Sequence, residues 1–321
     1  MRVWQGCGGT ASGRARKLIC SRVSYLCAMH KAGFVNIVGN PNAGKSTLMN
    51  VLVGERLSII TPKAQTTRHR ILGIVNADDY QIVYSDTPGM LRPRYKMHEG
   101  MMQFVGTAIS DADVLLFMVD LTDDEPFPEE YYKRIVNGKA PLLLLLNKID
   151  AVSEEQVNAA VAHWKTELPR AEIFTLSALK GVHVEQILAR ILELLPEHPA
   201  YYPKDELTDR PERFFVSEII RGKALEIYDK EIPYSIEVVV EEFKETEQII
   251  RIRAQIFTMR ETQKAIIIGH QGKAIKELGT RARLAMEEFL QKKVFLEMHV
   301  KVDKDWRDSE RRLKAYGYLP R

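Results

Sequence analysis

The chain has 321 residues, of which 45% are hydrophobic and 28% are charged, and its formal net charge is +3. This composition excludes a disordered or fibrous protein and is typical of a globular chain of about two domains. No apolar run approaches the roughly 20 residues that a membrane helix needs, so no transmembrane segment is predicted.

The first 28 residues differ from the rest in charge and in cysteine content. They hold all three cysteines and five basic residues but no acid, so the remainder carries a net charge of −2. We treat residues 1–30 as an extension with two interpretations. It is a basic targeting peptide, or a disordered arm upstream of a functional start at Met29, which we favour because no helical period is sustained. With no cysteine after Cys27, we expect no disulfide in the fold and a reducing compartment.

From residue 31 to residue 196, apolar runs alternate with helical patterns. The expected strands cover residues 34–38, 81–84, 114–119, 142–146 and 173–176, and the expected helices cover residues 45–53, 97–110, 129–137, 153–167 and 183–195. Such alternation predicts an α/β domain with a mostly parallel sheet and helices on both faces. Residues 142–146 are all leucine, as in a central strand that is buried on both sides.

A proline-rich stretch, residues 197–211, is predicted to be a linker. The pattern changes after it. We expect a helix over 214–230, strands over 235–243 and 248–258, a short helix ending at Gly269, a longer helix over 273–292, a strand over 294–302 and a charged final helix. This order predicts a smaller α+β domain over residues 212–321.

The segment GNPNAGKS, residues 39–46, follows an expected strand and opens an expected helix. It fits the pattern of a phosphate-binding P-loop, in which backbone amides cradle phosphate oxygens. Lys45 would add a positive charge, and the Ser46 hydroxyl is a candidate Mg²⁺ ligand. The expected phosphate-binding residues are Gly39, Asn40, Pro41, Asn42, Ala43, Gly44, Lys45, Ser46 and Thr47.

Two later segments are expected beside the phosphates. In the Asp-Thr-Pro-Gly segment at 86–89, Asp86 would hold Mg²⁺ through a water and the Gly89 amide would reach the third phosphate. The loop KAQTTRHR, residues 63–70, is a candidate switch, and Thr67 is favoured over Thr66 as a further Mg²⁺ ligand. The candidate residues of these segments are Gln65, Thr66, Thr67, Arg68, Asp86, Thr87, Pro88 and Gly89.

The segment NKID, residues 147–150, ends the leucine strand at the sheet edge where ligands bind. The Asp150 carboxylate can accept two hydrogens from guanine, and adenine lacks this donor pair, so the mismatch discriminates by up to ~10⁴–10⁵. Asn147 would brace the loop and contact the base, while the Ala178 amide would meet the guanine oxygen. The expected guanine-binding residues are Asn147, Lys148, Asp150, Ser177, Ala178 and Leu179, and GTP is the expected substrate.

A second kind of motif lies in the smaller domain, where Gly269-His270-Gln271-Gly272 joins two expected helices. A Gly-x-x-Gly link lets the backbone approach a nucleic-acid strand, as in KH domains, and the order of elements fits the type II arrangement. Residues 251–293 contain ten basic and four acidic residues, a balance that suits a sugar-phosphate backbone. The alternatives are helix-capping glycines and a solvated helix face. The candidate RNA-binding residues are Gly269, His270, Gln271, Gly272, Lys273, Lys276 and Arg281.

Taken in order, these motifs resemble the translation-factor class of P-loop GTPases and most closely the Era family. Gln-Thr-Thr-Arg at 65–68 and the stretch LTDRPERFFVSEIIRGKALEIYDKEIPYS at 207–235 also match that family, and the resemblance runs from about residue 31 to the end. It implies a GTPase that binds single-stranded RNA near the 3′ end of small-subunit (16S) ribosomal RNA and acts in assembly of the 30S subunit. It also implies a cytoplasmic protein, with peripheral contact to the inner face of the cell membrane as a further expectation.

Met90 stands where Ras-like GTPases carry a glutamine that orients the attacking water. In related GTPases an asparagine at the position of Asn42 helps to bind K⁺ beside the β–γ bridge. The resemblance therefore implies slow intrinsic hydrolysis that K⁺ and a bound partner accelerate. The alternative is that the Asn42 side chain caps its own loop.

Two rival functions remain open at this point. One is a membrane-associated regulatory GTPase for which RNA binding is secondary. The other is an RNA-binding protein with a vestigial nucleotide site, and the intact Lys45, Ser46, Asp86 and Asp150 argue against it. In the favoured interpretation, GTP orders the switch loop and reorients the KH domain about the linker.

Overall fold

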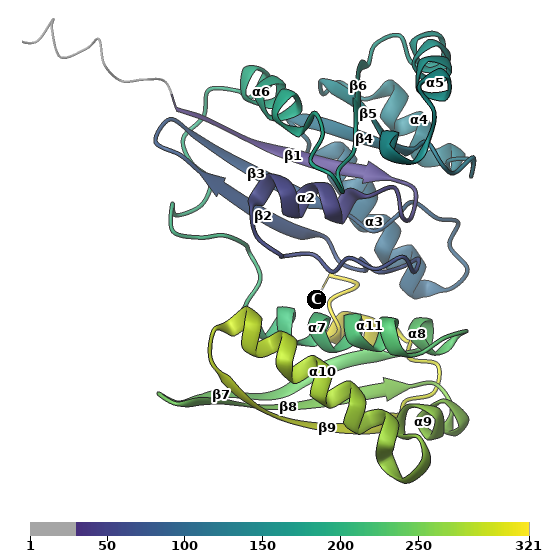
Figure 1. Ribbon diagram of the computed structural model, residues 1–321, viewed down its shortest axis with the longest axis vertical. Helices are drawn as coiled ribbons and strands as arrows, with labels where there is room; N and C mark the ends of the chain where they lie inside the picture. The colour runs from purple at the N-terminus through teal and green to yellow at the C-terminus, as the bar shows by residue number, and fades with distance from the viewer. Residues whose placement is uncertain (1–29, 321) are drawn as a thin grey trace, which may run out of the picture.

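The computed structural model describes residues 30–320, so the expectations for the N-terminal 28 residues lie outside the described part. Figure 1 shows two domains, each built on one sheet. The larger sheet has the strand order β2-β3-β1-β4-β5-β6. Its strands are β1 (Lys31–Gly39), β2 (Ile71–Asn76), β3 (Tyr80–Asp86), β4 (Val114–Asp120), β5 (Leu142–Asn147) and β6 (Glu172–Leu176).

The larger sheet is mostly parallel, as predicted. Only β2 runs antiparallel, along β3, and the other neighbouring strands pair in parallel. Strand β2 is not among the strands that the sequence pattern predicts. Its run is short and is interrupted by Gly73, a residue that weakens strand propensity. A Cβ at Gly73 would lie 2.7 Å from Val53 and 2.9 Å from Met49, so glycine allows helix α2 to pack closely on this strand.

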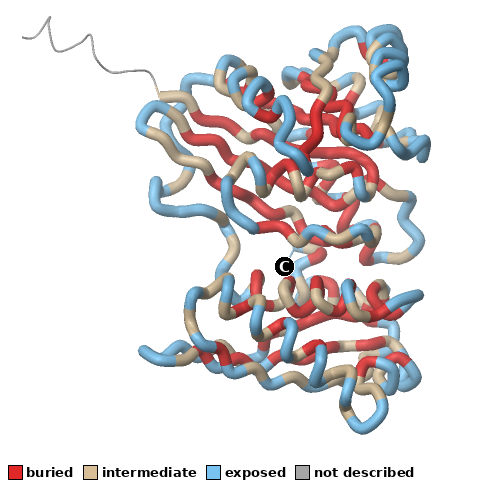
Figure 2. Tube along the Cα trace, viewed as in Figure 1, coloured by how far each residue is buried: buried red, intermediate tan, exposed pale blue. Residues whose placement is uncertain are grey.

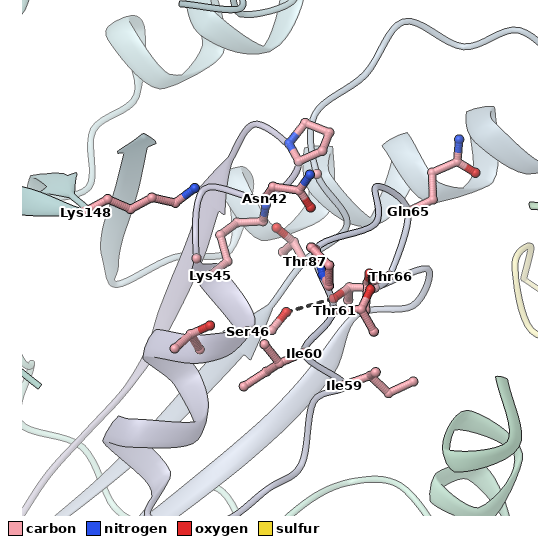
Figure 3. A pocket seen from close by; sticks show the side chains of 16 residues that line it. Asn42, Lys45, Ser46, Ile59, Ile60, Thr61, Gln65, Thr66, Thr87 and Lys148 are labelled. Carbon is pink, nitrogen blue, oxygen red and sulfur yellow. Dashed lines mark hydrogen bonds between the residues drawn. The ribbon is translucent and has the colours of Figure 1, made fainter. Parts of the chain in front are cut away.

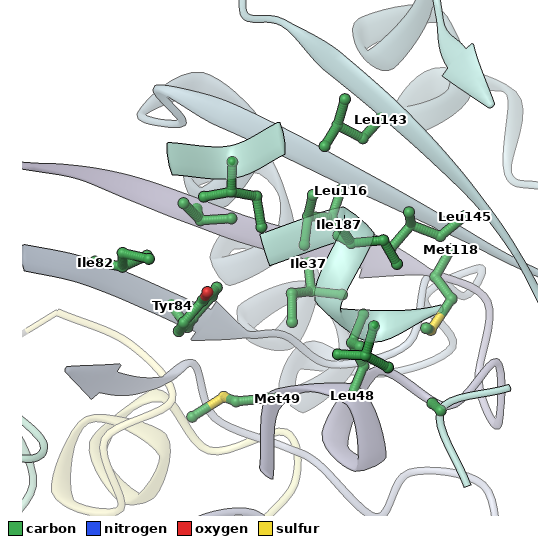
Figure 4. Packing of buried hydrophobic residues seen from close by; sticks show 14 of the residues in the cluster. Ile37, Leu48, Met49, Ile82, Tyr84, Leu116, Met118, Leu143, Leu145 and Ile187 are labelled. Atoms are coloured by element: carbon green, nitrogen blue, oxygen red, sulfur yellow. The ribbon is translucent and has the colours of Figure 1, made fainter. Parts of the chain in front are cut away.

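Helices cover both faces of this sheet, again as predicted. Buried side chains of α2 and α6 form one core with the strands (Figure 4), and those of α3, α4 and α5 form another. Strand β5 separates the two cores because successive side chains point to opposite faces. Leu143 and Leu145 enter the first core, whereas Leu142, Leu144 and Leu146 enter the second. The helices are α2 (Lys45–Val53), α3 (Lys96–Ser110), α4 (Glu129–Asn137), α5 (Glu154–Glu167) and α6 (Val184–Leu194), with a 3₁₀ turn η1 (Ile149–Ala151) after β5.

The segment between the two domains is attached to the larger one along much of its length. The Gln81 side chain accepts from the amides of Tyr201 and Tyr202 at 2.7 and 3.0 Å and donates to the Tyr202 carbonyl at 2.8 Å. Farther along, the Ile74 amide donates to the Leu207 carbonyl at 2.8 Å. Residues 201–207 therefore pack along the β2–β3 edge, and Arg210, farther along the segment, donates to the Arg70 carbonyl at 3.0 Å.

The smaller domain has the α-β-β-α-α-β order that the sequence predicts, with one additional short helix, α8. Its sheet order is β7-β8-β9, in which β7 pairs antiparallel and β9 parallel with β8. Helices α7 and α10 bury their apolar sides on one face of this sheet. The elements are α7 (Glu212–Ile227), α8 (Ile232–Ser235), β7 (Glu237–Glu245), β8 (Ile249–Thr258), α9 (Glu261–Ile268), η2 (His270–Gly272), α10 (Lys273–Leu290), β9 (Lys293–Val302) and α11 (Glu310–Ala315).

The C-terminal segment lies between the domains, where Figure 1 marks the end of the chain. Trp306 and Tyr318 are buried and belong to the core that α3 and α4 form in the larger domain. The Met97 amide at the start of α3 donates to the Arg307 carbonyl at 2.9 Å. In Figure 2, α7, α8 and the C-terminal segment each contain buried residues. Within residues 30–320, no helix has both the length and the apolar character needed to cross a bilayer.

Candidate functional site

A cavity of about 270 Å³ opens at the carboxyl edge of the larger sheet, which is where ligands bind in such folds. The phosphate loop, the candidate switch loop and the segment after β3 surround it (Figure 3). Its walls also include residues 59–62, which the sequence analysis did not single out. Of the expected residues, it is lined by Pro41, Asn42, Gly44, Lys45, Ser46, Thr47, Gln65, Thr66, Thr67, Thr87, Gly89 and Lys148.

The phosphate loop folds as a tight turn into α2. Gly44 has φ +98°, and a Cβ there would lie 2.3 Å from the Asn147 side chain, so only glycine fits. Lys45 is buried and donates from Nζ to the Asn40 carbonyl at 2.8 Å. Burial lowers the pKa of Lys45 to about 8, against the attraction of Asp86, which raises it. A bound phosphate would stabilise the charged form, so this lysine is arranged for an anion.

Three side-chain oxygens converge at the start of α2. Ser46 Oγ donates to Asp86 Oδ2 at 2.7 Å, and Thr67 Oγ1 lies 2.9 Å from Ser46 Oγ and 3.2 Å from Asp86 Oδ2. Asp86 Oδ1 is buried without a hydrogen-bond partner in the described chain. Burial raises the pKa of Asp86, although Ser46 and Lys45 lower it. An orphaned buried carboxylate oxygen beside two hydroxyls fits a hard cation such as Mg²⁺.

The geometry distinguishes the two threonines of the switch loop. Thr66 Oγ1 points away from Asp86, because it lies 2.7 Å from Thr61 Oγ1 and donates to the Lys63 carbonyl at 2.5 Å. Thr67 alone faces Ser46 and Asp86. Within residues 30–320 no three His, Cys, Asp or Glu side chains form a metal cluster. The donor set here therefore suits a cation that arrives with nucleotide phosphates as its other ligands.

The segment after β3 is fixed against the phosphate loop. Thr87 donates from Oγ1 to the Ile37 carbonyl at 2.7 Å, and Pro88 is buried. A Cβ on Gly89 would lie 2.6 Å from Pro41, so the two loops touch through their backbones. Met90 is buried, with 2% of its surface exposed, in the core that α3 covers. Its side chain is therefore turned away from the cavity and cannot position a water there.

The expected guanine-binding residues come together at the ends of β5 and β6. Asn147 is buried, donates to the Ala43 carbonyl at 2.8 Å and accepts from the Ala178 amide at 2.9 Å. This one side chain joins three motifs, and it occupies the amide that we expected to meet guanine. A hydrogen bond with Ser177 holds the pKa of Asp150 below its usual value, so the exposed carboxylate is charged and available. Leu179 is 75% exposed.

Asp120 belongs to this site although the sequence analysis missed it. It is the last residue of β4, and its carboxylate pairs with Lys148 Nζ. Lys148 has φ +70°, and the pair holds its side chain beside the cavity. The signal was an acid directly after an unbroken apolar strand, at the same sheet edge as the other motifs.

Asn42 stands at the rim of the cavity with its side chain exposed and φ +61°. Within residues 30–320 its side chain has no hydrogen-bond partner, so the loop-capping alternative is not seen there. Arg68, in contrast, does not line the cavity. It is 1% exposed, and its guanidinium donates to carbonyls of the smaller domain.

The Gly-x-x-Gly segment of the smaller domain forms the turn η2 between α9 and α10. Gly269 and Gly272 have φ +72° and +74°, and a Cβ on Gly272 would meet nothing within 4 Å. The turn is therefore open to an approaching backbone at Gly272, whereas a Cβ on Gly269 would lie 2.6 Å from Ala274. Beside it, a groove of about 340 Å³ runs between α10 and β9. It is lined by Ile275, Lys276, Gly279, Thr280, Arg283, Leu296 and Met298.

The groove includes only part of the expected RNA-binding set. Lys276 lines it, whereas Arg281 lies on another side of α10 and pairs with Glu277 at 2.5 Å. Arg283, which also flanks the Gly-x-x-Gly segment in the sequence, lines the groove together with Lys276. The i, i+4, i+7 spacing of Lys276, Thr280 and Arg283 is the signal that could have identified this face.

Comparisons with known proteins agree with both halves of this geometry. The family described as 50S ribosome-binding GTPase matches residues 34–148, and the KH domain family matches residues 231–307. GTPase Era from Staphylococcus haemolyticus is 41% identical over 292 residues, covering 90% of this chain and 98% of that protein. Its counterpart from Staphylococcus epidermidis has the same identity and coverage.

Solved structures show the same similarity. A crystal structure of Era in complex with MgGDPNP and nucleotides 1506–1542 of 16S ribosomal RNA has a TM-score of 0.86 and 39% identity. A point variant of Era from Aquifex aeolicus bound to GDP and AlF₄⁻ has a TM-score of 0.84 and 38% identity. In each case the match covers 90% of this chain and 99% of the other.

Proposed function

Because the chain belongs to the Era family of GTPases, we propose that it hydrolyses GTP to GDP and phosphate and that the bound nucleotide controls how its KH domain binds RNA. The observation that carries this proposal is the convergence of Ser46, Thr67 and Asp86 at the phosphate loop, with Asp150 in the turn after β5 at the same edge of the sheet. The first three side chains suit magnesium-bound phosphates, and the Asp150 carboxylate suits guanine.

The residues of the cavity divide the work on the phosphates. Amides of residues 42–47 face the anion at the start of α2, and Lys45 places its charge between the terminal phosphates. We assign Ser46 and Thr67 as direct ligands of Mg²⁺, and Asp86 holds it through a water. Bound Mg²⁺ supplies neutralisation of the charge that develops during phosphoryl transfer. We assign to the Gly89 amide a contact with the third phosphate, which GTP has and GDP lacks.

Water positioning falls to groups other than Met90, whose side chain lies in the core. We propose that Asn42 helps to bind K⁺ beside the bridging oxygen, where a cation neutralises developing charge. Its exposed amide, which has no partner within the described residues, supports this role. Hydrolysis is then faster in KCl than in NaCl, and Asn42→Ala removes the difference. Equal wild-type rates in the two salts would exclude the ion.

We propose that the α10–β9 groove and the Gly269–Gly272 turn bind about four unpaired nucleotides, the usual length for a KH groove. A relative of similar structure was solved with nucleotides 1506–1542 of 16S ribosomal RNA, so the target we propose is the single-stranded 3′ region of that RNA during 30S assembly. The rival function, a membrane-associated regulatory switch, gains no such support. Cytoplasmic location and any peripheral membrane contact are part of the proposal, and vesicle co-sedimentation tests the contact.

Two measurements test this function. Calorimetry with Mg²⁺ should show GTP bound far more tightly than ATP, since ATP leaves the Asp150 carboxylate unpaired. Crosslinking to cellular RNA, followed by mapping, should recover the 3′ end of the small-subunit RNA. Equal affinity for ATP and GTP, or crosslinks scattered over unrelated RNA, would overturn the proposal.

A further inference from the structure

The smaller domain contacts the backbone of the switch loop through a buried arginine. Arg221 projects from α7 and is 1% exposed. Its guanidinium donates to the Thr66 carbonyl and, at 3.4 Å, to the Gln65 carbonyl. These are the two carbonyls that directly precede Thr67, so a side chain of the KH domain contacts the backbone of the nucleotide site.

The Arg221 guanidinium is itself held in a fixed orientation. Glu218, one turn earlier on α7, accepts from its Nε at 2.7 Å and also from its Nη2. Burial alone would raise the pKa of Glu218, but the charge and hydrogen bonds of Arg221 lower it on balance, so the pair stays ionised. Only a planar guanidinium can serve two carboxylate oxygens and two carbonyls together.

A second contact holds the loop on the other side of Thr67. Arg68 donates to the Ile236 and Pro233 carbonyls at 2.8 and 3.1 Å. It also lies 3.4 Å from Glu237. Thr67 is thus bracketed by backbone and side-chain contacts at residues 65, 66 and 68, all made by the smaller domain. Between these contacts, its hydroxyl faces Ser46 at 2.9 Å.

We propose that Arg221 is a positioning residue for the magnesium–GTP state. By fixing the carbonyls of Gln65 and Thr66, it keeps the Thr67 hydroxyl directed toward Ser46 and Asp86. The proposal rests on the GTPase function argued above, and it gives that function a route between the sites. Coupling is reciprocal, so the contact that steadies Thr67 also makes the KH domain respond to the third phosphate.

The test uses the full chain carrying Arg221→Lys or Arg221→Gln, with Arg213→Lys and Arg213→Gln as matched controls. Arg213 lies on the same helix, but its guanidinium donates to the Val240 and Glu241 carbonyls of its own domain. Affinity for a fluorescent, non-hydrolysable GTP analogue is measured across a Mg²⁺ titration, and affinity for GDP is measured alongside.

We expect the half-saturating Mg²⁺ concentration with the GTP analogue to rise by about fivefold or more in Arg221→Gln, at the lower end of typical couplings between sites. Arg221→Lys should recover part of this loss, and GDP affinity should change by less than about twofold. The Arg213 variants should resemble the wild type. Mg²⁺ dependence that is unchanged in the Arg221 variants would overturn the proposal.

Hydrogen exchange on the wild type covers the case in which an Arg221 variant does not fold. Amides of residues 65–68 and of α7 should gain protection together when the GTP analogue replaces GDP. Protection that changes in the loop alone would contradict the coupling. A wild type that binds no GTP would instead refute the proposed function, so the two failures are distinguishable.

Discussion

Replacing Arg68 by methionine should weaken the contact between the two domains. The Arg68 guanidinium is buried against Glu237, and it satisfies two carbonyls of the smaller domain. Methionine keeps much of the apolar stem but removes the charge and every donor. Glu237 then remains buried with the Tyr318 hydroxyl, at 2.7 Å, as its remaining side-chain partner in the described chain.

The structure sets the size of this effect. Breaking a buried ion pair by removing one partner costs about 3–5 kcal/mol, because the other charge is left uncompensated. We expect a cost near the lower figure, about 3 kcal/mol, since Tyr318 still donates to Glu237. Burial already raises the pKa of Glu237, and loss of Arg68 raises it further. A carboxyl group whose folded pKa is raised favours folding at low pH, so the deficit should shrink as the pH falls.

Urea unfolding measured by circular dichroism, at neutral pH and again near pH 5, tests this reasoning. Lys133→Met is the control, because Lys133 and Glu129 form an exposed i,i+4 pair at 2.6 Å, and its loss should cost less than about 0.5 kcal/mol. Adding Glu237→Gln to Arg68→Met should recover about 1 kcal/mol or more, as expected for coupled neighbours. Equal costs for Arg68→Met and Lys133→Met would refute the buried pair as a structural link.

Three further predictions concern guanine recognition, the contact between the domains and the RNA groove. Asp150→Asn should weaken GTP binding at least about 100-fold and favour xanthosine triphosphate, because the amide donates where the carboxylate accepts. Burial lowers the pKa of His69 to about 4, below the ordinary 6.5, despite Glu218, which raises it. The free energy of unfolding should therefore fall by about 3 kcal/mol as the pH drops from 6.5 toward 4, because the unfolded chain binds a proton at His69 that the folded chain does not. Urea unfolding at several pH values should show a smaller decrease for His69→Phe. Lys276→Ala should reduce the slope of log affinity against log salt by about 0.7 for a single-stranded RNA.

Each of these predictions has a specific contrary result. Asp150→Asn that still prefers GTP over xanthosine triphosphate would remove Asp150 from the base site. The His69 ring stacks on the Tyr318 ring, with 4.5 Å between the ring centroids. If the unfolding free energy of wild type and His69→Phe changed identically with pH, burial in this position would not lower the pKa of His69. Lys292, which pairs with Glu245 outside the groove, is the control for RNA binding. A salt slope changed as much by Lys292→Ala as by Lys276→Ala would argue against the groove.

The sequence was most informative where chemistry imposes local rules. Gly44 must be glycine because its φ is +98° and Asn147 occupies the space of a Cβ. A buried strand, a turn of this kind and a helix occupy adjacent residues, so a short pattern reveals all three. The five consecutive leucines of β5 were an equally clear signal, because a parallel strand buried on both faces needs apolar side chains along its length.

The contacts between the domains could not be predicted from the sequence. Arg221 follows an ordinary helical pattern, and charged residues are rarely buried, so nothing local marks it as a ligand of the switch loop. Its partner carbonyls lie more than 150 residues away. The placement of Arg68 and Trp306 depends in the same way on how the domains dock. The linker prediction missed the attachment of Tyr201 and Tyr202 to Gln81 because the Gln81 side chain contacts only their backbone atoms, which any residue at those positions supplies.

The most direct test of the central claim is the affinity of the full chain for a labelled single-stranded RNA from the 3′ end of 16S ribosomal RNA. Fluorescence anisotropy would compare the GDP form with the form that holds a non-hydrolysable GTP analogue and Mg²⁺, at one fixed salt concentration. We predict a difference of about fivefold or more between the two forms, a typical coupling between sites, and its loss in Lys45→Ala. The same affinity in both forms would contradict a nucleotide-controlled RNA switch.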